Sequence, residues 1–403
     1  MQNPDTATPP GQSGRGVFEV FIAFLRLGLT SFGGPVAHLG YFRNEFVLRR
    51  GWLDDRSYSD LVALCQFLPG PASSQVGMAL GMGRAGWPGA LAAWLGFTLP
   101  SAAALILFAY GIAEYRGVAE SGWVHGLKVV AVAVVAQAVW GMARTLCPDR
   151  MRTGFAILAT LVTLALPSAM GQILAILLTA LLGWRLLTPP EQAAHAPHGF
   201  GVSRRAGIVA WVLFALLLGG LPLWAVASGS QTASLIDGVF RAGALVFGGG
   251  HVVLPLLDAT VVSSGLVSRP DFVAGYGAAQ AVPGPLFTFA AYLGAVVQGP
   301  LQGWVGGLIL LVVIFVPALL LLVGALPFWE DLRRMPGIQT AMAGVNAGVV
   351  GILVSALYDP VWTSAIHDRI DFALAVAAFG LLVHARMSPI LVVLLAAEAG
   401  AML

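Results

Sequence analysis

Long apolar runs separated by short polar loops are the feature that most constrains this chain. About thirteen of them recur along the 403 residues, and most are long enough to cross a hydrocarbon layer of roughly 30 Å as helices. Composition agrees, because only 10% of the residues are charged, against roughly 25% in a typical soluble domain. The sequence therefore predicts an all-α, polytopic membrane protein with about 10–13 transmembrane segments.

Polar stretches divide the chain into parts. Residues 1–16 lack the basic start, apolar core and cleavage site of a signal peptide, so we expect a disordered tail. The later stretch TPPEQAAHAPHGFGVSRR cannot bury an apolar face and reads as a linker. We predict membrane repeats at 17–187 and 234–403, joined by residues 188–233, which contain one extra apolar segment, Ala206–Val226.

The two membrane parts resemble each other. RLGLTSFGG at residues 26–34 aligns with RAGALVFGG at residues 241–249 without a gap. QFLPGP at residues 66–71 aligns with QAVPGP at residues 280–285, in the same order along the chain. Such internal duplication is typical of secondary transporters.

The relative orientation of the two copies depends on which apolar runs cross the membrane. If all of them cross, the extra segment Ala206–Val226 inverts the second copy; if both PGP segments are re-entrant hairpins, the copies are parallel. The distribution of Lys and Arg between alternate loops is compatible with both topologies. We favour inversion, since it allows alternating access by rocking one copy against the other.

Each PGP segment predicts a broken helix. The first proline disfavours helix at the residue before it, Gly70 or Gly284 leaves the backbone unrestricted, and Pro71 or Pro285 suits the first position of a new helix. The new helix presents unpaired amides at membrane depth, where an anion can accept their hydrogen bonds. Hydroxyl donors follow at Ser73, Ser74 and Thr288. The alternative is a proline kink whose carbonyls bond to neighbouring helices.

Paired glycines follow the first apolar segment of each copy and predict a second backbone site for an anion. The pairs are Gly33 with Gly34 and Gly248 with Gly249, and helix C-caps are the alternative role.

Titratable residues near these turns are candidates for proton coupling. His38 and His251 lie just beyond the glycines, although a hydrogen-bonded structural role is commoner for a single histidine. Glu45 is a third candidate, with an ion pair to Arg49 or Arg43 as its alternative.

Arg26 and Arg241 occupy equivalent places within apolar segments, where a central arginine costs about 2.5–3.5 kcal/mol. We expect a bound oxyanion to be the partner of each guanidinium, with snorkelling to the headgroups as the alternative. Gln66 and Gln280 precede the two PGP motifs and are expected to act as neutral donors beside the same path.

No catalytic pattern is present. The chain has no phosphate-binding loop with lysine, no GxSxG, no HExxH and no CxxC, so we expect neither an enzyme nor a cofactor or metal. A net charge of +2 gives no basic surface for nucleic acid. The expected partners are the lipid bilayer and an oxyanion, and a homodimer is compatible with the sequence.

These motifs carry a family resemblance. FGGPVAHLGYFRNEFVLRRGWLDD, ALCQFLPGPASSQVGMALG and GWPGALAAWLGFTLP resemble the amino-terminal half of the chromate ion transporter family. FGGGHVVLPLL and GYGAAQAVPGPLFTFAAYLG resemble its second half. The second copy departs from the first, with Gly250 in place of Pro35 and no counterpart of RRGWLDD.

The resemblance implies a two-domain protein of the bacterial inner membrane that exports chromate and confers chromate resistance. Sulfate or another tetrahedral oxyanion is the alternative substrate, and a membrane scaffold without transport is the alternative class.

Overall fold

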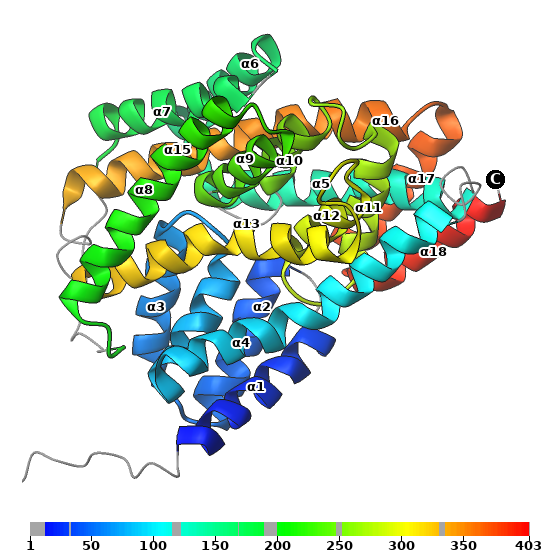
Figure 1. The fold of residues 1–403 in the computed structure, drawn as a ribbon. Coiled ribbons are helices and arrows are strands. Elements are labelled where there is room, and N and C mark those ends of the chain that lie inside the picture. The colour runs from blue at the N-terminus through cyan, green and yellow to red at the C-terminus, as the bar shows by residue number, and fades with distance from the viewer. Residues whose placement is uncertain are drawn as a thin grey trace, which may run out of the picture.

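The computed structural model describes residues 13–31, 34–114, 122–167, 169–188, 200–246, 252–329 and 335–402. Every regular element in these ranges is helical, which confirms the all-α prediction (Figure 1). The first helix begins at Ser13, within the predicted tail rather than after it.

The helices of the first repeat and of the segment after it are α1 (Ser13–Thr30), α2 (Gly34–Phe42), η1 (Arg43–Arg49), α3 (Asp55–Phe67), α4 (Ala72–Glu114), α5 (Gly122–Leu146), α6 (Arg150–Ala165), α7 (Ala169–Leu186) and α8 (Arg204–Ser228). The second repeat contains α9 (Gln231–Leu245), α10 (Val253–Val261), α11 (Arg269–Ala281), η3 (Leu286–Thr288), α12 (Phe289–Val296), α13 (Gly303–Ala325), η4 (Leu326–Phe328), α15 (Pro336–Ala356), η5 (Leu357–Trp362), α16 (Thr363–Ala365), α17 (Arg369–Val383) and α18 (Pro389–Met402).

Polar caps fix where several of these helices start. Ser203, Ser230 and Ser268 each accept a hydrogen bond from the amide three residues later, and so begin α8, α9 and α11. Because such residues compete with helical hydrogen bonding in the middle of a helix, they stand at the ends of the apolar runs.

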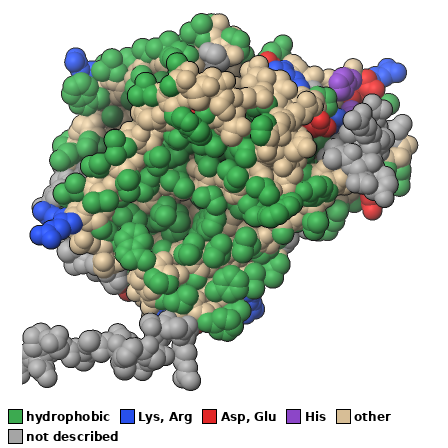
Figure 2. Space-filling model, in the orientation of Figure 1, with side chains coloured by type: hydrophobic (Ala, Val, Ile, Leu, Met, Phe, Trp, Pro, Cys, Tyr) green, Lys and Arg blue, Asp and Glu red, His purple; other side chains and the backbone are tan. Residues whose placement is uncertain are grey.

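Five helices in the described part of the chain are long and apolar enough to cross a membrane: Ala72–Gly111, His125–Leu146, Arg204–Ser228, Gly303–Phe328 and Pro336–Asp359. Figure 2 shows apolar side chains over the middle of this face of the molecule and charged ones near its margins. The chain is a multi-pass membrane protein.

Equivalent helices of the two repeats run in opposite directions. The amide of Trp304, at the start of α13, donates to the hydroxyl of Tyr110, near the end of α4, at 2.9 Å. Further along, the rings of Trp94 and Phe315 meet with centroids 5.6 Å apart. Since residue numbers rise along one helix and fall along the other, the copies are related by inversion, as favoured from the sequence.

The broken helices of repeat one return to the end of the molecule from which they start. Glu19, near the start of α1, bonds to Arg50 after η1 at 3.0 Å and to Arg84 of α4 at 2.9 Å. The backbone of Ala85 and Gly86 is not helical and separates the first part of α4 from its long second part. The chain therefore reverses between α1 and α2 and again at the PGP break between α3 and α4.

Repeat two shows the same reversal at the opposite end. The amide of Gln298, after α12, donates to the carbonyl of Leu266, before α11, at 3.1 Å. Neither topology considered from the sequence included this combination. Re-entrant PGP segments go together with inverted copies, because the chain also reverses between α1 and α2 and between α9 and α10, where a Cβ on Gly238 would lie 2.4 Å from Cγ2 of Thr260.

The two repeats are interlocked rather than side by side. A Cβ added to Gly126 of α5 would lie 2.0 Å from the carbonyl oxygen of Ala396 in α18. In the corresponding helix pair of the other repeat, a Cβ on Gly344 of α15 would lie 2.1 Å from the carbonyl oxygen of Thr179 in α7. Because each repeat holds a helix of the other at backbone contact, rocking of one whole copy against the other is disfavoured.

The arrangement predicts opposite exposure of Arg50 and Arg269. Single cysteines, Arg50→Cys and Arg269→Cys, on a background carrying Cys65→Ala and Cys147→Ala, should react with an impermeant maleimide from opposite faces of oriented vesicles. Labelling of both positions from one face would contradict the inverted arrangement.

Candidate substrate site at the helix breaks

The PGP break of each repeat is bonded to the first helix of the other repeat. The amide of Gly70 donates to the carbonyl of Val246 at 2.6 Å, and the amide of Gly284 donates to the carbonyl of Ser31 at 3.0 Å. Val246 and Ser31 occupy matching places before the FGG turns of their copies. The two bonds are therefore a symmetric pair, and each joins a PGP break to the end of the first helix of the other repeat.

Both break glycines have a conformation that side chains resist. Gly70 has φ of +114° and Gly284 has φ of +104°. A Cβ at Gly70 would lie 3.0 Å from the Cβ of Ala318, and one at Gly284 would lie 2.9 Å from Oγ of Ser101. Backbone angle and space thus both require glycine.

The second half-helix of repeat one begins as predicted. The amide of Gln75 is bonded to the carbonyl of Pro71 at 3.0 Å, so the amides of Ala72, Ser73 and Ser74 precede the first helical hydrogen bond. Buried Gln75 holds the break by donating from its side chain to the carbonyls of Pro69 at 3.0 Å and Ala318 at 3.3 Å.

The second half-helix of repeat two begins differently. A 3₁₀ turn, η3, follows Pro285 and precedes α12. The hydroxyl of Thr288 donates to the carbonyl of Pro285 at 2.7 Å, so this predicted donor is used within its own turn.

A small cavity of about 60 Å³ lies where the FGG turn of repeat one meets the PGP break of repeat two. It is lined by Ser31, Gly34, Pro35, Val134, Gln137, Ala279, Gln280, Val282, Gly284 and Leu286. The structure therefore brings three predicted residues, Gly34, Gln280 and Gly284, into one site built from both copies.

Buried side-chain polar atoms without a hydrogen-bond partner occur in several places in the described part of the chain. Two of them, Oγ of Ser31 and Nε2 of Gln280, belong to residues that line this cavity, and Nε2 of His38, Oγ of Ser74 and Oγ1 of Thr98 lie on α2 and α4 of repeat one. Since buried polar groups are nearly always paired, such a group needs water or a ligand.

His38 lies among these atoms. Its Nδ1 is 3.4 Å from Oγ of Ser73, and its ring packs edge-on against Phe97 with centroids 5.2 Å apart. His38 is almost fully buried, so Nε2 is the ring atom left for a ligand or a proton.

The two membrane arginines lie outside this cavity. Arg26 is exposed on the outer side of α1, without an ion pair among the described residues, and it does not line the cavity. Arg241 bonds to buried Asp237, one turn earlier in α9. The expected oxyanion partner of Arg241 is thus replaced by a carboxylate, which helical spacing places on the same face.

The remaining predicted residues are placed as follows. Gln66 is exposed near the end of α3, and Pro71 is buried in the break. Glu45 bonds to Arg49 at 2.5 Å and to Arg50 at 2.6 Å, which is the ion-pair alternative to coupling. Gly33, Gly248, Gly249 and His251 lie outside the described residues.

A second, larger hollow of about 370 Å³ opens at the end of the molecule where α1 starts. Arg50 and Arg84 stand over the ring of Trp52, with guanidinium carbons 5.5 and 5.6 Å from its centroid, and Glu19 bridges them. Nearby, the hydrogen bond from Arg43 holds the pKa of Asp55 below its usual range. Repeat two has glycine and leucine where repeat one has Arg50 and Arg84.

Sequence reasoning missed several lining residues. Gln137 is the lone polar residue in an apolar stretch of α5, and that isolation was a usable signal. Ser31, which also lines the cavity, had no comparable signal, because serine is common at helix ends, and only packing of one repeat on the other makes it part of the site.

The break geometry predicts that even the smallest side chain disrupts transport. Gly70→Ala and Gly284→Ala should each cost about 1–3 kcal/mol in strain and sharply reduce transport per inserted molecule. Gly219→Ala in α8, where a Cβ meets open space, is the control and should behave as wild type. Normal transport by both break variants would show that the breaks are simple kinks.

Comparison with known proteins agrees with this architecture. The model of the chromate transporter family matches residues 18–184 and again residues 233–401. A chromate transport protein of Pseudomonas aeruginosa is 27% identical over 88% of this chain and 82% of its own length. One from Cupriavidus metallidurans is 25% identical over 84% of this chain and 81% of its own length. A probable chromate transport protein of Synechococcus elongatus is 25% identical over 88% of this chain and 87% of its own length. No solved structure matches. The chain belongs to the chromate transporter family.

Proposed function

We propose that this protein is a secondary active transporter that exports chromate across the bacterial inner membrane and so confers chromate resistance. Family membership and the names of its relatives support chromate as the substrate. Inverted repeats with broken helices are a common architecture of secondary transporters, and the sequence has no nucleotide-binding loop that would supply energy from ATP.

The observation that carries the proposal is a cavity lined by both repeats in which two buried polar atoms, Oγ of Ser31 and Nε2 of Gln280, have no hydrogen-bond partner. An oxyanion offers several acceptor oxygens, and Nε2 of Gln280 and the hydroxyl of Ser31 are donors of the required kind. The helix start after Pro285 adds the amide of Leu286, a residue that lines the same cavity.

The distribution of basic side chains indicates which side of the membrane the hollow around Trp52 faces. Its end of the molecule carries most of the basic side chains in the described part of the chain, among them Arg49, Arg50, Arg84, Arg144, Arg150, Arg152, Arg185, Arg204 and Arg205. The opposite end has Arg269 and Arg369. Because positive loops face the cytoplasm, we assign the hollow to the cytoplasmic side.

Two arginines at the mouth of a hollow attract a dianion from solution and raise its local concentration. Their ion pairs with Glu19, and that of Arg50 with Glu45, leave part of each guanidinium free for an oxyanion, since guanidinium has five donors. The cavity itself is lined by neutral groups only. We infer that Arg50 and Arg84 attract the substrate to the cytoplasmic mouth of the hollow. Neutral donors then bind it in the cavity, weakly enough that it can be released.

The direct test is transport by purified protein in vesicles. Chromate should accumulate in vesicles whose cytoplasmic face is outward, without ATP and in response to an imposed pH gradient or membrane potential. Excess sulfate added outside measures how well the site separates the two oxyanions. Uptake equal to that of empty vesicles under every gradient would contradict transport and favour the scaffold alternative.

The cavity predicts which residues set the half-saturating chromate concentration. Losing a hydrogen bond to a charged group costs about 1.5–3 kcal/mol, so Gln280→Leu should raise this concentration roughly ten- to 150-fold. Arg26→Gln, on the outer surface, should change it less than about threefold. A large effect of Arg26→Gln with a small one of Gln280→Leu would return the charge-partner role to Arg26.

A further inference from the structure

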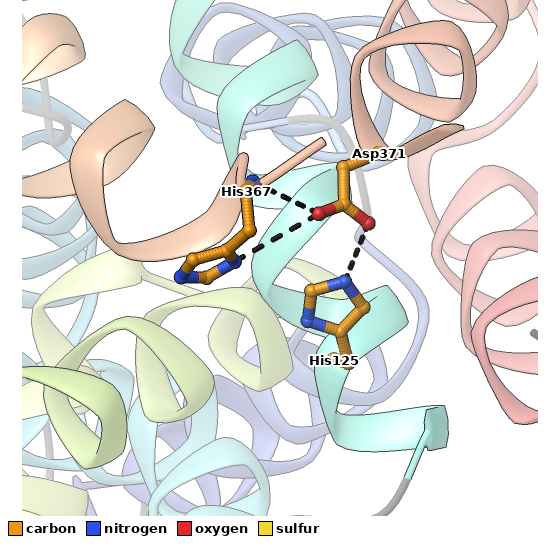
Figure 3. Close-up of side chains that lie close together, drawn as sticks. All are labelled: His125, His367 and Asp371. Carbon is orange, nitrogen blue, oxygen red and sulfur yellow. Dashed lines mark hydrogen bonds and ion pairs between the residues drawn. The ribbon is translucent and has the colours of Figure 1, made fainter. Parts of the chain in front are cut away.

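Three side chains of the kinds that bind metals meet at the end of the molecule opposite the cytoplasmic hollow. They are His125 in the first turn of α5, His367 just before α17, and Asp371 in the first turn of α17 (Figure 3). One ligand atom from each lies within 4.8 Å of the others. The group lies far from the cavity at the breaks and belongs to no part of the proposed path.

The carboxylate of Asp371 is the centre of the group. Nε2 of His125 lies 2.6 Å from its Oδ1, and Nδ1 of His367 lies 3.8 Å from its Oδ2. Figure 3 shows the two imidazole rings approaching this carboxylate from different sides, one from α5 and one from the segment before α17.

The backbone around Asp371 holds that carboxylate in place. The side chain of Asp368 caps α17 by accepting the amides of Ile370 and Asp371, and the amide of His367 donates to Oδ2 of Asp371 at 3.0 Å. The side chain of Asp371 is only 8% exposed, whereas that of His125 is 32% and that of His367 is 63% exposed. A buried, oriented carboxylate thus stands between two histidines that solvent can reach.

We propose that His125, His367 and Asp371 bind a divalent transition-metal ion of the zinc type. Two imidazole nitrogens and one carboxylate oxygen form a common ligand set for such ions, with water completing the tetrahedron. Ligand atoms at bonds of about 2.0–2.2 Å stand roughly 3.3 Å apart in a tetrahedron. Nε2 of His125 must therefore move slightly away from Oδ1, and exposed His367 must rotate inward.

Such an ion would join the two repeats. His125 belongs to the first repeat, while His367 and Asp371 belong to the second, and 246 residues separate His125 from Asp371. The neighbour of His125, Gly126, is at backbone contact with Ala396 of α18. The metal would therefore fasten α5 to the α17–α18 pair on the non-cytoplasmic side, where extracellular metal has access to it.

The test uses the full chain without a polyhistidine tag, purified in detergent and stripped with a chelator. Zn²⁺ binding is measured by calorimetry, Co²⁺ binding by its visible absorption, and thermal unfolding with and without Zn²⁺. Wild type should bind one ion per chain and unfold at a higher temperature with Zn²⁺. His125→Ala and His367→Ala should each weaken binding by at least about tenfold and lose this stabilisation.

His384→Ala, at the other end of α17, is the matched control and should bind like wild type. Because the His367 side chain is largely exposed, His367→Ala keeps the test valid even if the other variant folds poorly. Equal Zn²⁺ affinity in wild type and His367→Ala, or no Zn²⁺-dependent stabilisation of wild type, would overturn the proposal. The group would then be a hydrogen-bonded clamp between the repeats.

Discussion

Two backbone hydrogen bonds, Gly70 to Val246 and Gly284 to Ser31, hold the centre of this protein together. In a membrane an unpaired backbone group costs several kcal/mol, so a broken helix is stable only where another element supplies the missing partner. Here each repeat supplies it for the other. The polar cavity at mid-depth follows from this exchange, because four helix ends meet where an intact bundle would have only side chains.

The two repeats share a backbone arrangement but differ in their charged side chains. Repeat one has Arg50 and Arg84 at its hollow, which repeat two lacks, and repeat two pairs Arg241 with Asp237, which repeat one cannot do at Arg26. Inverted copies of equal chemistry would offer the same surface to both sides of the membrane. The differences in charge give the two ends of the molecule distinct surfaces.

Local steric signals made part of this structure predictable. Proline and glycine in the PGP motifs act on their own backbone, so the breaks follow from the local sequence. The duplication follows from the matching motifs of the two copies. The pairing of Asp237 with Arg241 was equally local, at one helical turn, and should have been read from spacing. The isolation of Gln137 in an apolar stretch was a local signal, but its place beside the cavity and the meeting of His125 with Asp371 depend on contacts between repeats, which no local pattern encodes.

The central claim is that residues from both repeats line one chromate site. Ser31→Cys and Gln280→Cys, each on a background carrying Cys65→Ala and Cys147→Ala, place a thiol in the cavity from opposite repeats. The measurement is the rate of brief reaction with a small soluble thiol reagent against chromate concentration, with chromate alone as the control for thiol oxidation. The account predicts that chromate protects both thiols, each variant with a half-saturating concentration raised by the donor that it has lost. Protection of one thiol only, or of neither, would contradict it.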